Sequence, residues 1–310
     1  MTRPTRMIAL ALAGGSMLAG MTAATATAHP GHDHTTPVKI RFTAVNGTAA
    51  VSCATPVTGL GTTSATAAVN DLRFSISNVR MVRPNGTSVP LTLTGSRAFN
   101  ATVKGERTTL IDLENGRGSC AAEGDRRMNA AISGTVPVGR YVGVRMYMGV
   151  PFTLNHTDLL TGPRALDSAA MAWSWQSGRK FSKIELGDPA GPGGTWSSRT
   201  FMFHLGSTGC IGDPATGATV DCAKSNRTAI RLAAFDPATQ KVAIDLGALT
   251  AGNDVTVNRA GAPGCMSGPT DPECGPVFAA LGLGWATDGS GTGMPLRGGA
   301  TQTLFRAIPR

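Results

Sequence analysis

Apolar residues recur at every second position in a series of short segments, the pattern of strands with one buried face. In "DLRFSISNVRMV", Leu72, Phe74 and Ile76 fall on one face, and charged or hydroxyl side chains alternate with them. The same alternation runs through "VKIRFTAV", "TTLIDLE", "NAAISGTV", "YVGVRMYMGV", "KFSKIEL", "RTFMFHLG", "TAIRLAAF" and "KVAIDLGAL". Gly, Pro, Asn and Asp separate these segments, and Asn85-Gly86 is a hairpin turn signal. The pattern predicts an all-β fold, an antiparallel β-sandwich-like single domain with long Gly/Pro-rich loops.

The first residues read as a secretory signal peptide. Arg3 and Arg6 precede the apolar stretch "MIALALAGGSMLAG", and the small residues of "ATATA" place the expected cleavage near Ala28. That stretch is too short to span a membrane, and no later segment is long and apolar enough to do so. We therefore expect a secreted or periplasmic protein without a membrane span. The predicted divisions are a signal peptide (1–28), a polar His-containing leader (29–37) and one β domain (38–310).

The six cysteines indicate disulfide bonds rather than a metal site or a redox motif. An even number of cysteines in an exported chain is typical of a disulfide set, and no CxxC occurs. Six cysteines allow fifteen pairings, so the sequence does not fix the connectivity. Proximity along the chain favours the pairs Cys210–Cys222 and Cys265–Cys274, which leaves Cys53–Cys120.

Charge and motifs argue against nucleic-acid binding and against common types of catalysis. The formal net charge is +9, but the basic residues form no Lys/Arg block. The chain contains no G-x-S-x-G, H-E-x-x-H, P-loop or dinucleotide fingerprint. "GSTGC" after His204 superficially resembles a nucleophile turn, but Cys210 has a ready disulfide partner in Cys222. We assign no catalytic residue.

Histidine and tryptophan are scarce and gather in one part of the chain. The segment "MAWSWQSGRKF" holds Trp173 and Trp175, two of four tryptophans, and it lies between His156 in "GVPFTLNH" and His204 in "FMFHLG". An extended "MAWSW" would put both indoles on one face with Met171. In "TFMFHL" the phenylalanines share one face, so His204 is expected to face solvent or a cleft. Two imidazoles near sulfur or aromatic groups favour copper, whereas the alternative is structural histidines and core tryptophans.

The leader offers a second possible metal site. Cleavage after Ala28 would expose His29, whose α-amine and imidazole together can chelate copper, with His32 and His34 close by. The alternative is a flexible tail that binds metals loosely, since Pro30 and Gly31 supply no rigid scaffold.

Several segments in series resemble one known family. "YVGVRMYMGVPFTLNHTD", "MAWSWQSGRKFSKIEL", "FMFHLGSTGC", "CAKSNRTAIRLAAFD" and "PGCMSGPTDPEC" occur in the order found in the MbnP-like proteins, also called metallo-mystery-pair four-Cys motif proteins. The resemblance runs from about Val38 to the C-terminus. This chain has six cysteines where the family name specifies four, and its "HPGHDH" leader lies outside the resemblance.

The resemblance implies an exported copper-binding protein that is paired with a di-haem cytochrome c peroxidase-like enzyme. That partner oxidises a tryptophan to kynurenine, so this chain would be a substrate rather than a catalyst, acting in copper acquisition or handling. Position by position, the resemblance makes His156 and His204 copper ligands and makes Trp173 or Trp175 the modified residue. Two alternatives remain: a copper oxidase or oxygenase that uses His29, and a disulfide-stapled domain that acts by protein contact alone.

Overall fold

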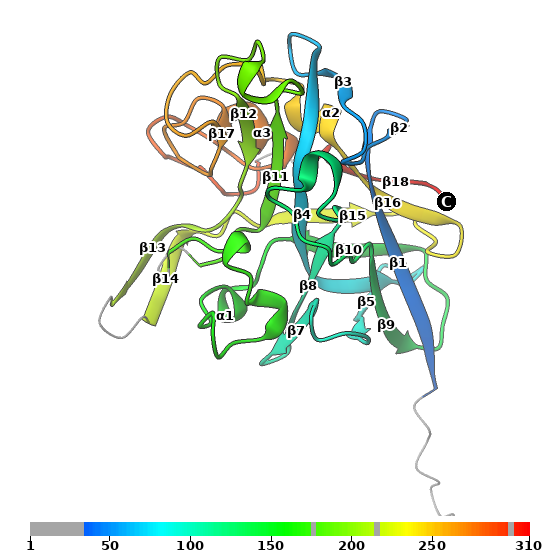
Figure 1. Ribbon diagram of the computed structural model, residues 1–310. Helices are drawn as coiled ribbons and strands as arrows, with labels where there is room; N and C mark the ends of the chain where they lie inside the picture. The colour runs from blue at the N-terminus through cyan, green and yellow to red at the C-terminus, as the bar shows by residue number, and fades with distance from the viewer. Residues whose placement is uncertain (1–33, 175–177, 214–217, 297–300) are drawn as a thin grey trace, which may run out of the picture. The chain divides into compact units, whose positions relative to one another are not determined.

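Strands are the predominant regular structure of the described residues, as the alternation predicted (Figure 1). The computed structural model describes residues 34–174, 178–213, 218–296 and 301–310. The longer strands are β1 (Thr35–Asn46), β4 (Ala65–Val82), β8 (Glu106–Asp112), β9 (Ala131–Pro137), β10 (Gly143–Met148), β11 (Ser182–Gly187), β13 (Thr208–Asp213), β14 (Ala218–Lys224), β15 (Thr228–Leu232), β16 (Gln240–Asp245) and β18 (Phe305–Pro309). The shorter strands are β2 (Ala49–Ala50), β3 (Val57–Leu60), β5 (Ser88–Pro90), β6 (Thr92–Leu93), β7 (Asn100–Val103), β12 (Thr200–Phe203) and β17 (Gly264–Cys265).

Helical elements are short. The α-helices are α1 (Phe152–Asn155), α2 (Leu246–Thr250) and α3 (Cys274–Ala280), and the 3-10 helices are η1 (Gly118–Cys120), η2 (Arg164–Leu166), η3 (Ala169–Met171) and η4 (Gly191–Gly193). None of the helices in the described ranges is long and apolar enough to cross a membrane. Because strands predominate over these short helices in the described residues, the all-β prediction is confirmed.

The described strands pair into two large sheets and one separate hairpin. One sheet has six strands in the order β18-β16-β1-β9-β6, with β2 beside β1, and the other has ten strands along β15-β10-β4-β11-β12-β17. In the second sheet β3, β5 and β8 also pair with β4, β7 pairs with β8, and β13–β14 form the hairpin. Pairing is mostly antiparallel, as expected, but β1–β16 and β12–β17 are parallel. Each parallel pair joins strands that are distant in sequence, and the alternation pattern does not report such pairing.

The two large sheets share one apolar core. Phe42 on β1 packs edge-on against Phe74 on β4 with ring centroids 5.9 Å apart, and Phe74 packs against Phe305 on β18 at 5.6 Å. All three rings are at most 4% exposed. Because β1 and β18 belong to one sheet and β4 to the other, these contacts join the two layers as in a β-sandwich.

The long strand β4 is buried on both faces. Its apolar face carries Leu72, Phe74 and Ile76 into the core, as the alternation indicated. On the opposite face Asp71 and Arg73 are also buried, at 0% and 2% exposed. This second face is covered by loops and by neighbouring strands, so charged side chains lie paired inside the protein.

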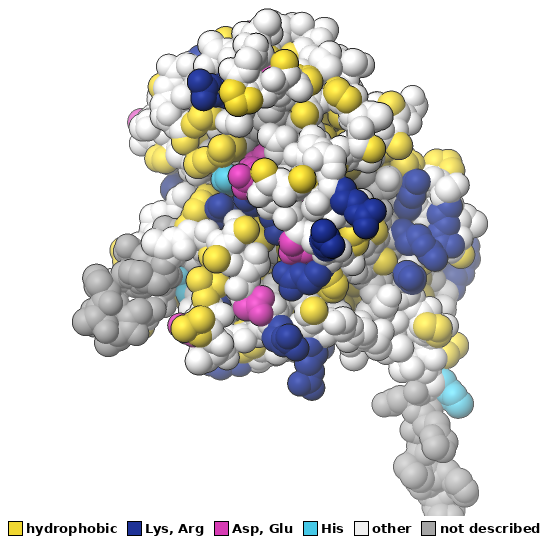
Figure 2. Space-filling view, viewed as in Figure 1, with side chains coloured by type: hydrophobic (Ala, Val, Ile, Leu, Met, Phe, Trp, Pro, Cys, Tyr) yellow, Lys and Arg dark blue, Asp and Glu magenta, His cyan; other side chains and the backbone are white. Residues whose placement is uncertain are grey.

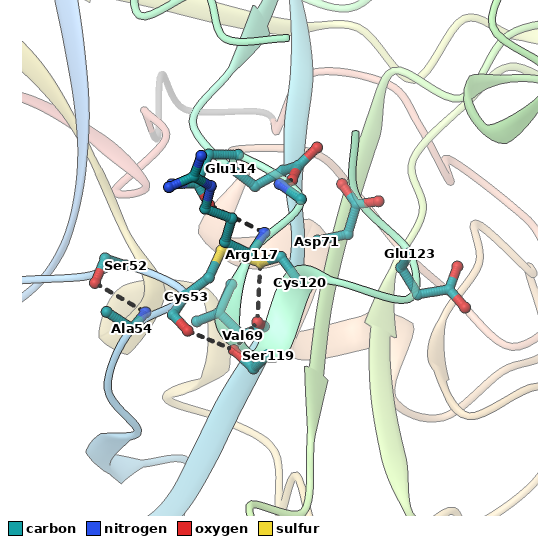
Figure 3. The surroundings of a disulfide bond; sticks show 12 residues. Ser52, Cys53, Ala54, Val69, Asp71, Glu114, Arg117, Ser119, Cys120 and Glu123 are labelled. Carbon is teal, nitrogen blue, oxygen red and sulfur yellow. Dashed lines mark hydrogen bonds between the residues drawn. A yellow bond between two sulfur atoms is a disulfide. The ribbon is translucent and has the colours of Figure 1, made fainter. Parts of the chain in front are cut away.

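The three disulfide bonds have the predicted connectivity: Cys53–Cys120, Cys210–Cys222 and Cys265–Cys274. The first fastens the loop before β3 to η1, and Figure 3 shows acidic side chains close to it. The hydroxyl oxygen of Ser119 lies 3.0 Å from the carbonyl oxygen of Cys53 and 2.5 Å from that of Val69 on β4. This disulfide and its neighbours therefore hold an outer loop against the central strand.

Residues Thr35–Arg310 form one compact unit. Strand β1 begins at Thr35, three residues before the start that the alternation suggested.

On the face drawn in Figure 2, Lys and Arg side chains gather where β1, β16 and β18 lie. The predicted signal peptide, with His29 and His32 of the leader, lies outside the described residues.

Candidate metal centre

His204 lies directly after β12 and is buried. Its exposed fraction is 3%, so of the two settings expected for it, solvent or a cleft, the first is wrong. Its Nε2 atom is 2.8 Å from Oε1 of Glu185 on the neighbouring strand β11. Its backbone N–H donates to the carbonyl of Cys265, and the hydroxyl of Ser267 donates to its carbonyl. The segment after β17 and strand β11 therefore cover the face that strand alternation left open.

The environment of His204 favours a neutral imidazole with a defined tautomer. Burial lowers its pKa, the hydrogen bond to Glu185 opposes that shift, and the charges of Lys180 and Lys183 add to it. A neutral ring that donates from Nε2 to Glu185 carries its lone pair on Nδ1. Nδ1 of His204 is buried and has no hydrogen-bond partner among the described residues. Metal-binding histidines commonly show this arrangement, in which a carboxylate holds one nitrogen and the other is left to the metal.

Glu185 is kept ionised by a buried network of paired charges. The Nζ atom of Lys183 lies 3.0 Å from Glu185, 2.7 Å from Asp71 and 3.1 Å from Glu123. Burial would raise the pKa of Glu185, but the His204 hydrogen bond and the charge of Lys183 together lower it. Arg73 donates from Nε to Asp71 over 2.8 Å and completes the network. The carboxylate beside His204 is thus a stable acceptor.

His156 lies in a different environment, at the end of α1. Its half-buried ring has Nε2 3.2 Å from Sγ of Cys222 and 3.0 Å from Nδ2 of Asn155. The ring also packs against Phe152, with centroids 4.9 Å apart. The imidazole therefore lies beside the Cys210–Cys222 disulfide of the β13–β14 hairpin.

Asn155 ties this region to the tryptophan loop. The side chain is fully buried, and its Oδ1 accepts a hydrogen bond of 2.8 Å from the backbone N–H of Arg179. Arg179 in turn donates from Nη1 to the carbonyl of Asn155. Nδ2 of Asn155 lies 3.5 Å from the hydroxyl of Ser207. One amide side chain thus connects α1, the loop after Trp173 and the segment that follows His204.

Trp173 stands in a tight loop rather than on a regular strand. Its backbone N–H donates to the carbonyl of Gly178 over 2.9 Å, and the neighbouring Ala172 is extended and forms an antiparallel β-bridge with Arg179. Met171 ends η3, so the extended stretch begins only after Met171. The half-buried indole lies directly against Gly206, where an added Cβ would come within 2.3 Å of the ring. It borders a cavity of about 270 Å³, and the other lining residues are Ser207, Thr208, Gly209, Cys210 and Met266.

The predicted site residues therefore contact or belong to segment 204–210 at three separate points. His204 begins the segment and pairs with Glu185, Trp173 lies on its middle, and His156 lies at the disulfide that ends it. Trp175 lies outside the described residues. His34 is exposed and belongs to the leader.

Sequence reasoning did not identify Glu185, Asn155 or Met266. A carboxylate between Ile184 and Leu186 in a buried strand was a signal that could have identified Glu185. Nothing in the local pattern marks Asn155 or Met266, because their importance comes from contacts with distant segments.

A second group of acidic side chains belongs to the charge network. The carboxylates of Asp112, Glu114 and Asp125 lie within 4.8 Å of one another. Burial raises the pKa of Asp112 to about 8, and the charge of Glu114 adds to this shift. Nη1 of Arg73 lies 3.6 Å from Asp125, and the backbone N–H groups of Gly116 and Asp125 donate to Glu114. The guanidinium of Arg73 and the backbone donors thus pair with Asp125 and Glu114, whereas Oδ2 of Asp112 has no hydrogen-bond partner among the described residues.

Comparison with known proteins supports the resemblance. A family model described as MbnP matches residues 35–267. Among solved structures, the chain is similar to MbnP from Methylosinus trichosporium, with 34% sequence identity and a TM-score of 0.76. That similarity covers 89% of this chain and 99% of the other. No curated protein sequence matches the chain. A family match over most of the chain, together with a solved structure of the same fold, shows that the chain belongs to the MbnP family.

Proposed function

We propose that this protein is an exported copper-binding protein in which His204 and His156 supply imidazole ligands and a tryptophan-derived kynurenine completes the donor set. The observation that carries the proposal is the buried, neutral His204, which donates from Nε2 to Glu185 and keeps Nδ1 without a partner among the described residues. A buried polar atom without a hydrogen bond is costly, and a bound ion would remove that cost.

The donor types near the site suit copper. Imidazole nitrogen and thioether sulfur are borderline to soft ligands, and Met266 borders the same cavity as Trp173. Bound copper would be the cargo of the protein, so the role of the protein's own residues is to bind and position the ion. Glu185 fixes the tautomer and orientation of His204, and Asn155 fixes the loop that carries the indole.

The tryptophan loop supplies the second part of the proposal. An intact indole has no good lone pair for a metal, whereas kynurenine carries an aromatic amine and a ketone oxygen. In its formation the C2–C3 bond of the indole breaks as two molecules of peroxide each give one oxygen atom and are reduced to water. Hydrolysis by one further water molecule then releases C2 as formate. A di-haem cytochrome c peroxidase-like partner would supply the oxidising equivalents. Trp173 borders an open cavity and is half-buried, so a partner could reach it. Trp175 is an equal candidate by sequence.

Co-expression with and without the di-haem partner tests the proposal. We expect a peptide map of Met171–Lys183 to show a kynurenine mass change only with the partner, and metal analysis to show stoichiometric copper only in the modified protein. His204→Ala should lose the copper, whereas His34→Ala, in the leader, should keep it. Unmodified tryptophan in both preparations, or no stoichiometric copper, would contradict the proposal. Loss of copper on deletion of residues 29–34 would instead favour a leader site.

A further inference from the structure

The disulfide of the β13–β14 hairpin differs from the other two. Cys210 and Cys222 face each other across the two strands, and both are half-buried. The cysteines of the other pairs are at most 7% exposed. Figure 1 shows the hairpin extending away from the two large sheets. A dissolved reductant therefore reaches the Cys210–Cys222 bond before it reaches the others.

An imidazole stands next to this bond. Nε2 of His156 lies 3.2 Å from Sγ of Cys222, and all three potential ligand atoms of His156, Cys210 and Cys222 lie within 4.8 Å of one another. A metal ion with about 2.3 Å bonds to thiolate sulfur and about 2.0 Å bonds to imidazole nitrogen fits ligand atoms roughly 3.5–3.8 Å apart. Only the two sulfur atoms must separate, because they are bonded to each other in the oxidised protein.

We propose that reduction of Cys210–Cys222 by a dithiol creates a second, redox-gated site for a thiophilic metal ion, formed by two thiolates and the imidazole of His156. In the exchange the Cys210–Cys222 bond breaks and the dithiol forms its own disulfide. The reductant supplies two electrons, and its two thiol protons pass to the sulfur atoms of Cys210 and Cys222. Metal binding then displaces both protons. Two thiolates with one imidazole form a soft donor set that favours Cu(I).

The surroundings assist this change. Both strands of the hairpin remain tied at their bases, because Asn226 donates from Nδ2 to the carbonyl of Gly206 over 2.7 Å, independently of the disulfide.

The test uses the full mature chain. After mild dithiothreitol treatment and anaerobic desalting, alkylation with peptide mapping should label Cys210 and Cys222 ahead of the other four cysteines. Cu(I) is then titrated against a chromogenic competitor. We expect reduced wild-type protein to bind one more equivalent of Cu(I) than oxidised protein. The double variant Cys210→Ser with Cys222→Ser should bind no additional equivalent under either condition.

The contribution of the imidazole is tested separately. His156→Ala keeps both thiols, and we expect about tenfold or more weaker Cu(I) binding in its reduced form. Co(II) offers a second readout, because a thiolate-to-cobalt charge-transfer band should appear in reduced wild-type protein and be absent from the double variant. Equal Cu(I) binding by oxidised and reduced wild-type protein would overturn the proposal, as would uniform labelling of all six cysteines.

This site would compete with the proposed copper site for the imidazole of His156. It is therefore tested in protein expressed without the di-haem partner, which lacks the kynurenine-dependent site. His204→Ala removes copper from the oxidised, modified protein but leaves the reduction-dependent equivalent in place. The double cysteine variant has the opposite effect. Failure of either site can therefore be recognised without reference to the other.

Discussion

Replacement of Gly206 by alanine tests how the tryptophan loop packs on the segment after His204. An added Cβ would lie 2.3 Å from Cζ3 and 2.8 Å from Cη2 of Trp173, and 3.1 Å from the carbonyl oxygen of Arg179. Ordinary carbon contacts are about 3.5–4.0 Å. The indole must therefore move by more than about 1 Å, because the backbone at Arg179 is held by Asn155. Overpacking of this kind costs about 1–3 kcal/mol.

We expect Gly206→Ala to lower the midpoint of thermal unfolding by about 2–12 °C, at about 2–4 °C per kcal/mol for a domain of this size. Near-ultraviolet circular dichroism should change as well, because the ring leaves its position against residue 206. Gly193→Ala is the matched control, since an added Cβ there has no neighbour within 4 Å. If Gly206→Ala matched Gly193→Ala in both stability and dichroism, the described packing of Trp173 would be wrong.

Three further predictions concern the charge network and the disulfides. Glu185→Gln should weaken copper binding by about 10–100-fold, measured by competition, because the partner of His204 loses its charge; unchanged affinity would argue against a ligand role for His204. The raised pKa of Asp112 means that the folded state binds more protons than the unfolded state between pH 3.8, the ordinary pKa of an aspartic acid, and about pH 8. Stability should therefore fall as pH rises through this window, by at most about 1.4 kcal/mol per pH unit, and Asp112→Asn should flatten denaturation curves measured across it. Replacing both Cys53 and Cys120 with alanine should cost about 4 kcal/mol in urea denaturation, since that disulfide spans 67 residues; a loss below about 1 kcal/mol would show that it constrains the unfolded chain little.

Strand positions and disulfide pairs could be predicted because both depend on local information. Period-two alternation places side chains on faces wherever strands form, and a turn signal at Asn85-Gly86 does join β4 to β5. Proximity identified the two short-range pairs, and elimination then left Cys53–Cys120.

The segments that pack over those strand faces could not be predicted from the sequence. Alternation put His204 opposite the phenylalanines, but burial depends on β11 and the segment after β17, which are brought there by strand order. Glu185 reaches His204 only because β11 and β12 pair in a particular register. The parallel pairing of β12 with β17 joins residues about sixty positions apart, and no local pattern encodes that contact.

The motif "HLGSTGC" can now be understood position by position. His204 needs burial and a carboxylate to present Nδ1, and Gly206 has no side chain because the indole of Trp173 occupies that space. Ser207 meets Asn155, and Gly209 takes a backbone φ of +64° that other residues rarely adopt. Cys210 then closes the hairpin beside His156. Seven residues thus place a histidine, a tryptophan and a disulfide at fixed intervals. An insertion within the motif would misplace at least one of them even though every residue type were kept.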